Sequence, residues 1–207
     1  TATLTPTATL TATATPTPTA TATATPQGWR LITAGADTYI YRNFPTLNFR
    51  NDSQLLLAAP DASHVLLRFD LADLPPGAVV QQALLRIQVI SPPPAAQIEA
   101  YQLLRPWEIT AATWQRATWQ EMWDAPGAAS PLDRSPSPAG AAFLPTAAGE
   151  MTLDITPLAQ AWAHGAANHG LLLRLRHESF QNLSLASLDT LAVDQRPRLE
   201  LFLADGG

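Results

Sequence analysis

The sequence predicts an all-β domain behind an extended tail, and three observations lead to this expectation. From Asp37 onward, short apolar or alternating segments are separated by clusters of Pro, Gly and Asp, a pattern typical of a β-sandwich or β-barrel. Residues 1–26 contain only Thr, Ala, Leu and Pro, and every charged residue lies after them. The remaining residues, about 180, suffice for one domain with a substantial core. We therefore divide the chain into a tail, residues 1–26, and a domain, residues 27–207.

Nine strands are expected in the domain, each a short run of apolar or alternating residues. They are expected at Thr38–Tyr41, Gln54–Leu57, His64–Phe69, Ala83–Ile90, Gln97–Leu104, Met151–Ile155, Gly170–Arg176, Leu183–Leu188 and Arg198–Leu203. In the first of these, alternation places Tyr39 and Tyr41 on one face and Ile40 on the other.

One short helix is expected after the sixth strand. Thr156 is a suitable N-cap, Pro157 suits the first helical position, and Gly165 suits the end of the helix. Its apolar face would contain Leu158, Ala161 and Trp162. Before it, the stretch from Gln115 to Gly149 is rich in Pro and Gly in its later part, so we expect a large irregular loop there.

The tail has a strict repeat of two residues. Thirteen threonines occupy every odd position from Thr1 to Thr25, with Ala, Leu or Pro between them. Because successive side chains of a strand point to opposite faces, an extended tail would have one hydroxyl face and one apolar face. Its only bulky apolar residues are Leu4 and Leu10.

The prolines of the tail would give such a strand two different edges. Pro6, Pro16, Pro18 and Pro26 all occupy even positions, so every missing N–H lies on one edge. The odd-residue edge keeps its donors and is able to pair with an exposed sheet edge of another chain. We therefore interpret the tail as a candidate assembly strand that cannot recruit a further strand on its other side.

The alternative interpretation of the tail is a solvated, O-glycosylated stalk or linker, which is the usual role of Thr/Pro/Ala tracts. The candidate O-glycosylation sites are Thr1, Thr3, Thr5, Thr7, Thr9, Thr11, Thr13, Thr15, Thr17, Thr19, Thr21, Thr23 and Thr25.

Composition excludes several classes of function. The formal net charge is −5 and no run of basic residues occurs, so we expect neither nucleic acid nor an anionic membrane as partner. All 12 basic residues are Arg and there is no Cys, which excludes lysine Schiff-base chemistry, thiol catalysis and disulfides. No apolar run approaches the roughly 20 residues that span a bilayer. The chain starts at Thr1 without an initiator Met or signal peptide, so we expect a mature or trimmed form at an extracellular or cell-surface location.

Several phrases of the domain go beyond general β patterning. The stretch Val65–Ile87, VLLRFDLADLPPGAVVQQALLRI, resembles the hallmark hairpin of the DNRLRE family, a group of exported bacterial β-sandwich modules related to carbohydrate-binding modules. Further phrases resemble the family in the same order, from residue 37 to residue 203. They are Asp37-Thr-Tyr, Pro45-Thr-Leu-Asn-Phe, Trp107-Glu-Ile-Thr-Ala-Ala-Thr-Trp, Leu153-Asp-Ile-Thr-Pro with Ala161-Trp, Asn168-His-Gly-Leu and Arg196-Pro-Arg-Leu.

The resemblance implies a jelly-roll-like antiparallel β-sandwich with a non-catalytic role, as a carbohydrate-binding module, an adhesive repeat or a component of a surface structure. The chain departs from the family pattern at Ile109, which follows Glu108, and in the Pro/Ala-rich segment 125–149.

No catalytic or metal-binding motif stands out, and we expect no cofactor. The four histidines, which we interpret as surface or packing residues, are His64, His164, His169 and His177. Glu108 and Asp154 are a conceivable carboxylate pair for glycoside hydrolysis, but with 17 acidic residues such pairs arise by chance. Oxygen ligands for a structural calcium ion are conceivable in Asp37, Asp124 and Asp133, although no dense D-x-D-x-D-G loop occurs.

Aromatic side chains provide the better candidate site, because their planes stack on sugars and anchor protein interfaces. We expect the three tryptophans of the family-like segments to be buried, namely Trp107, Trp114 and Trp162. Trp119 and Trp123, beside Arg116 in the long loop, are expected to be exposed as an interface or sugar platform, against the alternative of ordinary loop packing. Tyr41 is a candidate member of a second polar and aromatic surface near the first strand.

Two hypotheses for function follow, with a third in reserve. In the first, the chain is a non-catalytic subunit of an extracellular filament or sheath, polymerised head to tail through the assembly tail residues Leu4, Pro6, Leu10, Pro16 and Pro18. Extended, the 26 tail residues reach about 85 Å, which is enough to bridge subunits. In the second, it is a carbohydrate-binding module on a glycosylated stalk, with a polysaccharide as partner. The third, a hydrolase, would require a functional carboxylate pair.

Overall fold

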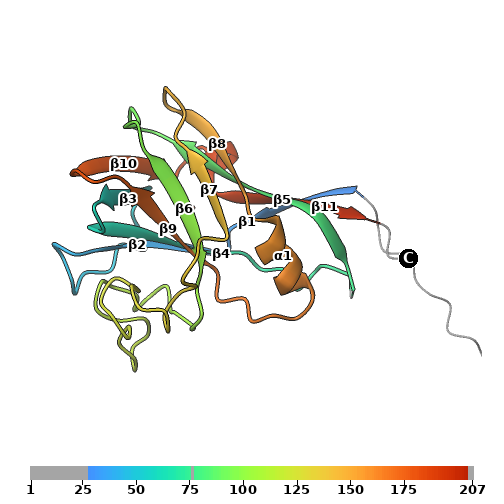
Figure 1. The fold of residues 1–207 in the computed structure, drawn as a ribbon, viewed down its shortest axis with the longest axis horizontal. Helices are drawn as coiled ribbons and strands as arrows, with labels where there is room; N and C mark the ends of the chain where they lie inside the picture. The colour runs from blue at the N-terminus through green and yellow to red at the C-terminus, as the bar shows by residue number, and fades with distance from the viewer. Residues whose placement is uncertain (1–27, 76, 205–207) are drawn as a thin grey trace, which may run out of the picture.

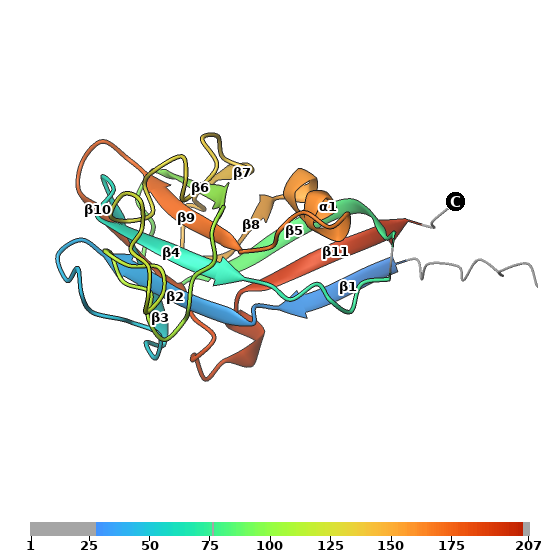
Figure 2. The same cartoon turned by 90° about the horizontal axis from the view of Figure 1, so that it is seen from below.

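The computed structural model describes residues 28–75 and 77–204, and the expected tail residues Leu4, Pro6, Leu10, Pro16, Pro18 and the candidate O-glycosylated threonines lie outside them. The described part is predominantly antiparallel β-structure with one short α-helix (Figures 1 and 2). The predicted fold class, a jelly-roll-like antiparallel β-sandwich with one helix, is confirmed. The strands are β1 Gly28–Thr33, β2 Ala36–Tyr41, β3 Gln54–Ala59, β4 Ser63–Arg68, β5 Val79–Val89, β6 Gln97–Gln102, β7 Gly140–Phe143, β8 Gly149–Asp154, β9 Leu171–Arg176, β10 Gln181–Ala186 and β11 Arg198–Ala204.

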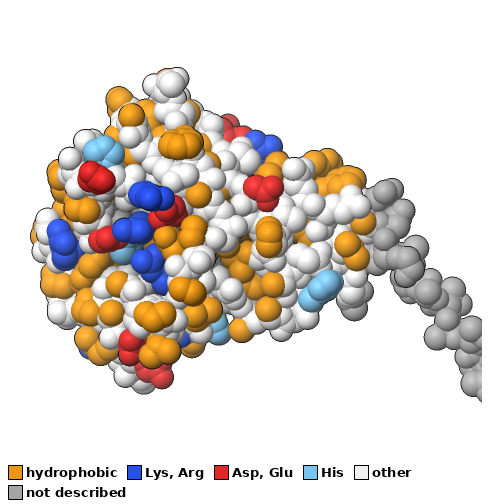
Figure 3. All heavy atoms as spheres, viewed as in Figure 1, with side chains coloured by type: hydrophobic (Ala, Val, Ile, Leu, Met, Phe, Trp, Pro, Cys, Tyr) orange, Lys and Arg blue, Asp and Glu red, His pale blue; other side chains and the backbone are white. Residues whose placement is uncertain are grey.

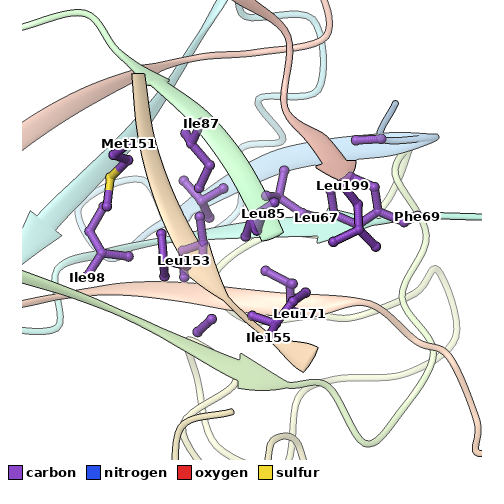
Figure 4. Packing of buried hydrophobic residues seen from close by; sticks show 14 of the residues in the cluster. Leu67, Phe69, Leu85, Ile87, Ile98, Met151, Leu153, Ile155, Leu171 and Leu199 are labelled. Carbon is purple, nitrogen blue, oxygen red and sulfur yellow. The ribbon is translucent and has the colours of Figure 1, made fainter. Parts of the chain in front are cut away.

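Two groups of strands form the layers of the sandwich. One contains β1-β11-β5-β10-β3 with β8 beside β5, and the other contains β4-β9-β6-β7 with β2 beside β4. Among the strands of the described residues, the only pairing between the two groups is that of β3 with β4, where the register has the single pair Ala58 and Ser63. Apolar side chains from both layers meet between them, and Figure 4 shows residues of β4, β5, β8 and β9, such as Leu67, Leu85, Leu153 and Leu171, turned to this shared interior.

A second hydrophobic core lies on the outer face of β2, β4, β6 and β9. The irregular segment 104–139 folds against this face and buries three of its tryptophans there. These tryptophans, Trp107, Trp114 and Trp123, share a cluster with Ile40, Leu66 and Leu172. Strands β2 and β4 are consequently buried on both faces, and Ile40 is as inaccessible as the residues of the main core.

All nine predicted strands are present, with ends shifted by up to a few residues. Two strands were missed. β1 begins immediately after the tail, and β7 interrupts the stretch 115–149 that was expected to be one irregular loop. The sequence of β7, GAAF, contains Gly and Ala, which have weak strand propensity, and pairing with β6 determines its conformation.

The predicted helix is α1, Thr156–Ala163, but its predicted cap is wrong. Thr156 lies inside the helix, where its Oγ1 accepts a hydrogen bond from the Ala83 N–H (2.9 Å) and donates to Asp154 (2.6 Å). The buried face consists of Leu158, Ala159 and Trp162, whereas Ala161 is only half-buried.

The C-terminal end of α1 falls where the sequence predicted it. Gly165 has a φ of +93°, and its N–H donates to the Trp162 carbonyl (3.0 Å). The Ala166 N–H donates to the Ala161 carbonyl (3.0 Å), which completes a Schellman motif. Glycine is favoured here because it adopts a left-handed conformation without a steric penalty.

The Asn168-His-Gly phrase has a structural role at the start of β9. The Asn168 side chain donates to the Phe69 carbonyl (2.8 Å) and accepts from the Gly170 N–H (3.0 Å). Gly170 has a φ of +85°, and a Cβ atom there would lie 2.2 Å from the Leu67 carbonyl oxygen. Glycine at this position therefore allows β9 to approach β4.

Candidate assembly edge and ligand surfaces

β1 is an edge strand. It pairs along all 6 of its residues with β11, from Gly28 opposite Leu203 to Thr33 opposite Arg198. Within residues 28–75 and 77–204, no second strand and no other backbone hydrogen bond satisfies it. Because alternate backbone groups of an edge strand point away from its neighbour, the free side of β1 presents a row of donors and acceptors. The strand-forming run Trp29 to Thr33 was the signal from which the sequence could have predicted this strand.

The outer face of β1 is apolar and exposed. Trp29 and Leu31 are 54% and 63% exposed. The Trp29 ring lies 5.3 Å from the ring of Phe202 on β11. We call Trp29, Leu31 and Phe202 the edge patch. Next to it, on the same face, Arg86, Glu150, Arg198 and Glu200 form an ion-pair network with no net charge.

A groove of 370 Å³ borders β1. One wall consists of β1 residues from Arg30 to Thr33, and the other consists of Asp70, Leu71, Asp73 and Leu74. β1 and the edge patch together form a surface that can accept an extended chain by backbone pairing, with apolar contacts on one side.

The predicted exposure of Trp119 is confirmed, since its exposed fraction is 60%. The indole is held in place by a hydrogen bond from its Nε1 to the Thr110 hydroxyl (3.3 Å). Arg116 donates to the Trp119 carbonyl (3.3 Å) and so supports the backbone of the same turn. Trp119 therefore presents a positioned aromatic plane to solvent.

The predicted exposure of Trp123 is wrong. Trp123 is only 4% exposed, belongs to the second hydrophobic core and donates from Nε1 to the Thr113 carbonyl (2.9 Å). Its backbone N–H donates to the Gln115 carbonyl (3.0 Å), which shows that the chain folds back on itself between these residues. Trp123 consequently cannot belong to a sugar platform with Trp119. The three tryptophans that were expected to be buried, Trp107, Trp114 and Trp162, are indeed buried.

Tyr41 belongs to a different surface. Its ring lies edge-on to Phe44 at 5.6 Å, its hydroxyl accepts from Asn43 (3.0 Å), and part of it contacts the main core. No hydrogen bond or aromatic contact between described residues joins Tyr41 to Arg116 or Trp119. The structure thus brings together Arg116 and Trp119 among the four predicted candidates.

The candidate calcium ligands have structural roles. Asp133 is fully buried and accepts hydrogen bonds from the N–H groups of Asp124 (2.9 Å) and Ala125 (3.0 Å) and from Arg105 (3.3 Å). Asp37 accepts from the Leu188 N–H (2.7 Å). In the described part of the chain, no group of three or more His, Cys, Asp and Glu side chains could hold a metal ion.

The other groups considered for chemistry also have local partners. His64 is buried, with Nδ1 2.8 Å from the Gly127 carbonyl, and is a packing residue as expected. Asp154 is bonded to Thr156 beside α1. Glu108 lies 3.5 Å from the Trp119 N–H in the irregular segment 104–139, which we call the tryptophan loop.

Comparison with known proteins gave no relatives. No family model matches the chain, and no curated protein matches it. The resemblance to the DNRLRE family stays a prediction based on the phrases quoted above. Among the described residues, no helix is sufficiently long and apolar to cross a membrane.

Asp37 should make stability depend on pH. Burial is the main cause that raises its pKa from 3.8 to about 6, so the folded state binds the proton more tightly than the unfolded state. The stabilisation by the protonated Asp37 carboxyl is complete below pH 3.8 and is lost as the pH rises through about 6. Relative to the original chain, Asp37→Asn should therefore gain roughly 2 to 3 kcal/mol in the free energy of unfolding between pH 4 and 7, measured by urea denaturation.

Asp61→Asn is the matched control for that series. The hydrogen bond with His64 and the pairing with Arg174 lower the pKa of Asp61, so its stabilisation is present above pH 3.8 and is lost as the pH falls below that value. The stability of the Asp61 variant relative to the original chain should fall as the pH rises to 3.8 and should not change further between pH 4 and 7, where the Asp37 variant gains relative stability. Parallel pH profiles for Asp37→Asn and the original chain would contradict the assignment.

The two loop tryptophans should respond differently to truncation. Trp123→Ala removes a buried side chain and should reduce the free energy of unfolding by about 3 to 5 kcal/mol. Trp119→Ala removes an exposed side chain and should cost less than about 1 kcal/mol. Urea denaturation measures both, and equal costs would show that the loop adopts another arrangement in solution.

Proposed function

We propose that the chain is a non-catalytic structural subunit that assembles outside the cell into a surface filament or sheath. The tail of one copy docks against the free edge of β1 in the next copy. The observation that carries the proposal is the edge of β1 that no strand among residues 28–75 and 77–204 pairs with, bordered by a groove and flanked by the exposed side chains of Trp29 and Leu31.

The tail matches this edge in its hydrogen bonding. Its odd residues keep every N–H, whereas Pro6, Pro16, Pro18 and Pro26 lie at even positions. A tail strand paired through its odd residues would fill the edge of β1 and present its proline-containing edge outward. Such pairing adds one strand and then stops.

The length of β1 indicates which segment of the tail docks against it. β1 has 6 residues, and the segment from Leu4 to Leu10 has 7, so the two lengths are similar. Ordering each backbone residue costs roughly 1 to 2 kcal/mol, and burying each Leu returns about 1.5 to 3 kcal/mol. Docking of residues 4–10 combines both leucines with continuous backbone pairing, which is what offsets the ordering cost.

The contact is heterologous, because the tail of one copy meets β1 of another. Heterologous contacts form open filaments unless the rotation between subunits closes a ring. A subunit with one tail and one edge therefore has one donor and one acceptor, which is sufficient for a linear polymer.

Assembly should depend on the tail and on its donor edge. Negative-stain electron microscopy of the full chain should show filaments, and a version that starts at Gly28 should remain monomeric. Leu4→Asp combined with Leu10→Asp should also prevent assembly. Filaments formed by the version without residues 1–27 would contradict the proposal.

A pair of proline substitutions controls for general effects on the tail. Thr7→Pro removes an N–H from the odd-residue edge and should prevent filament formation, whereas Ala8→Pro removes one from the outer edge and should leave filaments intact. If both variants behave alike in the same microscopy assay, the tail does not dock by one-sided strand pairing.

The second candidate function is a carbohydrate-binding module on a glycosylated stalk, which the positioned and exposed Trp119 favours. It predicts monomers and saturable binding of a polysaccharide. Trp119→Ala should weaken that binding roughly tenfold because stacking on a sugar ring is lost, with an unchanged melting temperature. Affinity electrophoresis against a panel of neutral and acidic polysaccharides measures the effect, with Phe180→Ala as a control at another exposed aromatic. Equal affinity of the two variants would remove Trp119 from the site.

A further inference from the structure

The hydrogen bonds at the end of β1 show which of its backbone groups face β11. The Ala34 N–H donates to the Pro197 carbonyl (3.0 Å), and this pair continues the antiparallel register of β1 with β11. Hydrogen-bonded residues alternate along an antiparallel pair with residues whose backbone groups point the other way. The even residues of β1 therefore bond to β11, and the backbone groups of Trp29, Leu31 and Thr33 point to the free side.

The residue after Ala34 follows the same alternation. The Gly35 N–H points away from β11 and donates to the Arg68 carbonyl at the end of β4 (2.8 Å). The free side of β1 therefore faces the segment after β4, whose residues between Asp70 and Leu74 form the other wall of the 370 Å³ groove. Within residues 28–75 and 77–204, no hydrogen bond satisfies the outward backbone groups of β1.

This groove suits an uncharged strand with small side chains. Its walls include Ile32, Leu71 and Leu74, which are partly buried and pack against the main core. Its charged residues, two Asp and one Arg, are exposed, so a strand without charges meets no like charge there. Figure 3 shows that most charged side chains of this view lie away from the end of the molecule where β1 begins.

The chain immediately before β1 has the sequence of a hairpin loop. Three-residue hairpin loops combine a type I turn with a third residue of positive φ, a position that favours glycine. Pro26 suits the first loop position, because proline presets the φ that a type I turn requires there. Gly28, at the third position, has a φ of +122°. A loop of residues 26–28 would place Thr25 opposite Trp29.

Such a loop brings together the two edges that have free N–H groups. In its register, Thr23 lies opposite Leu31 and Thr21 lies opposite Thr33, so the odd-residue edge of the tail meets the outward groups of β1. Because paired residues share a face, the alanines between these threonines lie on the same face as Ile32, toward the core. A shift by one residue would turn the threonines to the core instead.

We propose that residues 21–25 form this hairpin with β1 of the same chain and cap the assembly edge in the isolated subunit. The segment contains only Thr and Ala, which matches the narrow and mainly uncharged groove. A strand tethered through three loop residues acts at an effective concentration on the order of millimolar, so a dilute subunit is capped by its own chain.

The hairpin regulates assembly because both segments of the tail compete for one edge. The apolar face of residues 21–25 contains only Ala, whereas the segment from Leu4 to Leu10 of a neighbouring copy adds two leucines. The neighbour's segment buries more apolar area and replaces the cap when the subunit concentration is high enough. This effect on assembly rests on the proposed function, whereas the hairpin itself does not.

Amide hydrogen exchange measured by NMR tests the hairpin in the variant in which both tail leucines are replaced by Asp, so that docking between copies is prevented. In dilute solution, the N–H groups of Leu31 and Thr33 should exchange about tenfold more slowly than in the version that starts at Gly28. The N–H groups of Arg30 and Ile32, which bond to β11, are the internal control and should exchange at equal rates. Equal exchange of Leu31 and Thr33 in the two proteins would overturn the proposal.

A pair of proline substitutions tests the register in the same leucine-free variant. Thr23→Pro removes an N–H from the edge that pairs with β1, so the Leu31 N–H should exchange as fast as in the version without the tail. Ala22→Pro removes an N–H from the outer edge and should change this rate less than about twofold. Equal exchange rates in the two proline variants would contradict one-sided pairing in the same chain.

Filament formation by the chain with both leucines shows whether the hairpin regulates assembly. Thr23→Pro should lower the protein concentration at which filaments form about tenfold, because the edge is no longer occupied by its own chain. Thr7→Pro, the same substitution in the docking segment, should prevent filaments. Negative-stain microscopy of a dilution series measures both, and an unchanged or raised concentration for Thr23→Pro would overturn the regulatory role.

The two readouts separate the hairpin from the proposed assembly. Slow exchange at Leu31 and Thr33 without filaments from the original chain would support the hairpin and contradict the assembly. Filaments without slow exchange in the dilute variant would support the assembly and overturn the hairpin.

Discussion

The burial of β2 and β4 on both faces is the constraint on which the candidate ligand surfaces depend. The inner face packs in the sandwich, and the outer face is covered by the tryptophans of the loop 104–139. Asp133 stabilises the loop from within, because its fully buried carboxylate accepts two backbone N–H groups and the Arg105 guanidinium. Without this anchor, the loop would have to bury unsatisfied backbone donors against an apolar sheet. The loop in turn positions Trp119 above Thr110 and Arg134 above Tyr101.

The strands could be predicted from the sequence because alternation of apolar and polar residues depends on local geometry alone. The same rule failed where burial depends on a distant partner. β7 has little strand propensity of its own, and only its pairing with β6 makes it a strand. Thr156 has the side chain of an N-cap, but the Ala83 N–H competes for its oxygen and places it inside the helix.

The candidate site was predictable only in part for a similar reason. Trp119 and Trp123 have similar neighbours in the sequence, yet one is exposed and the other lies in the second core. The difference in exposure arises from the turn that pairs Trp123 with Gln115, and no periodic pattern in the sequence predicts this turn.

The edge of β1 is the surface on which the proposed assembly depends. β1 is an edge of the kind that natural β-proteins usually protect, and here it carries exposed Trp29 and Leu31 beside a backbone that no other described strand than β11 pairs with. An edge of this kind persists without uncontrolled aggregation when a dedicated strand covers it, and a tail with prolines on its outer side satisfies that requirement.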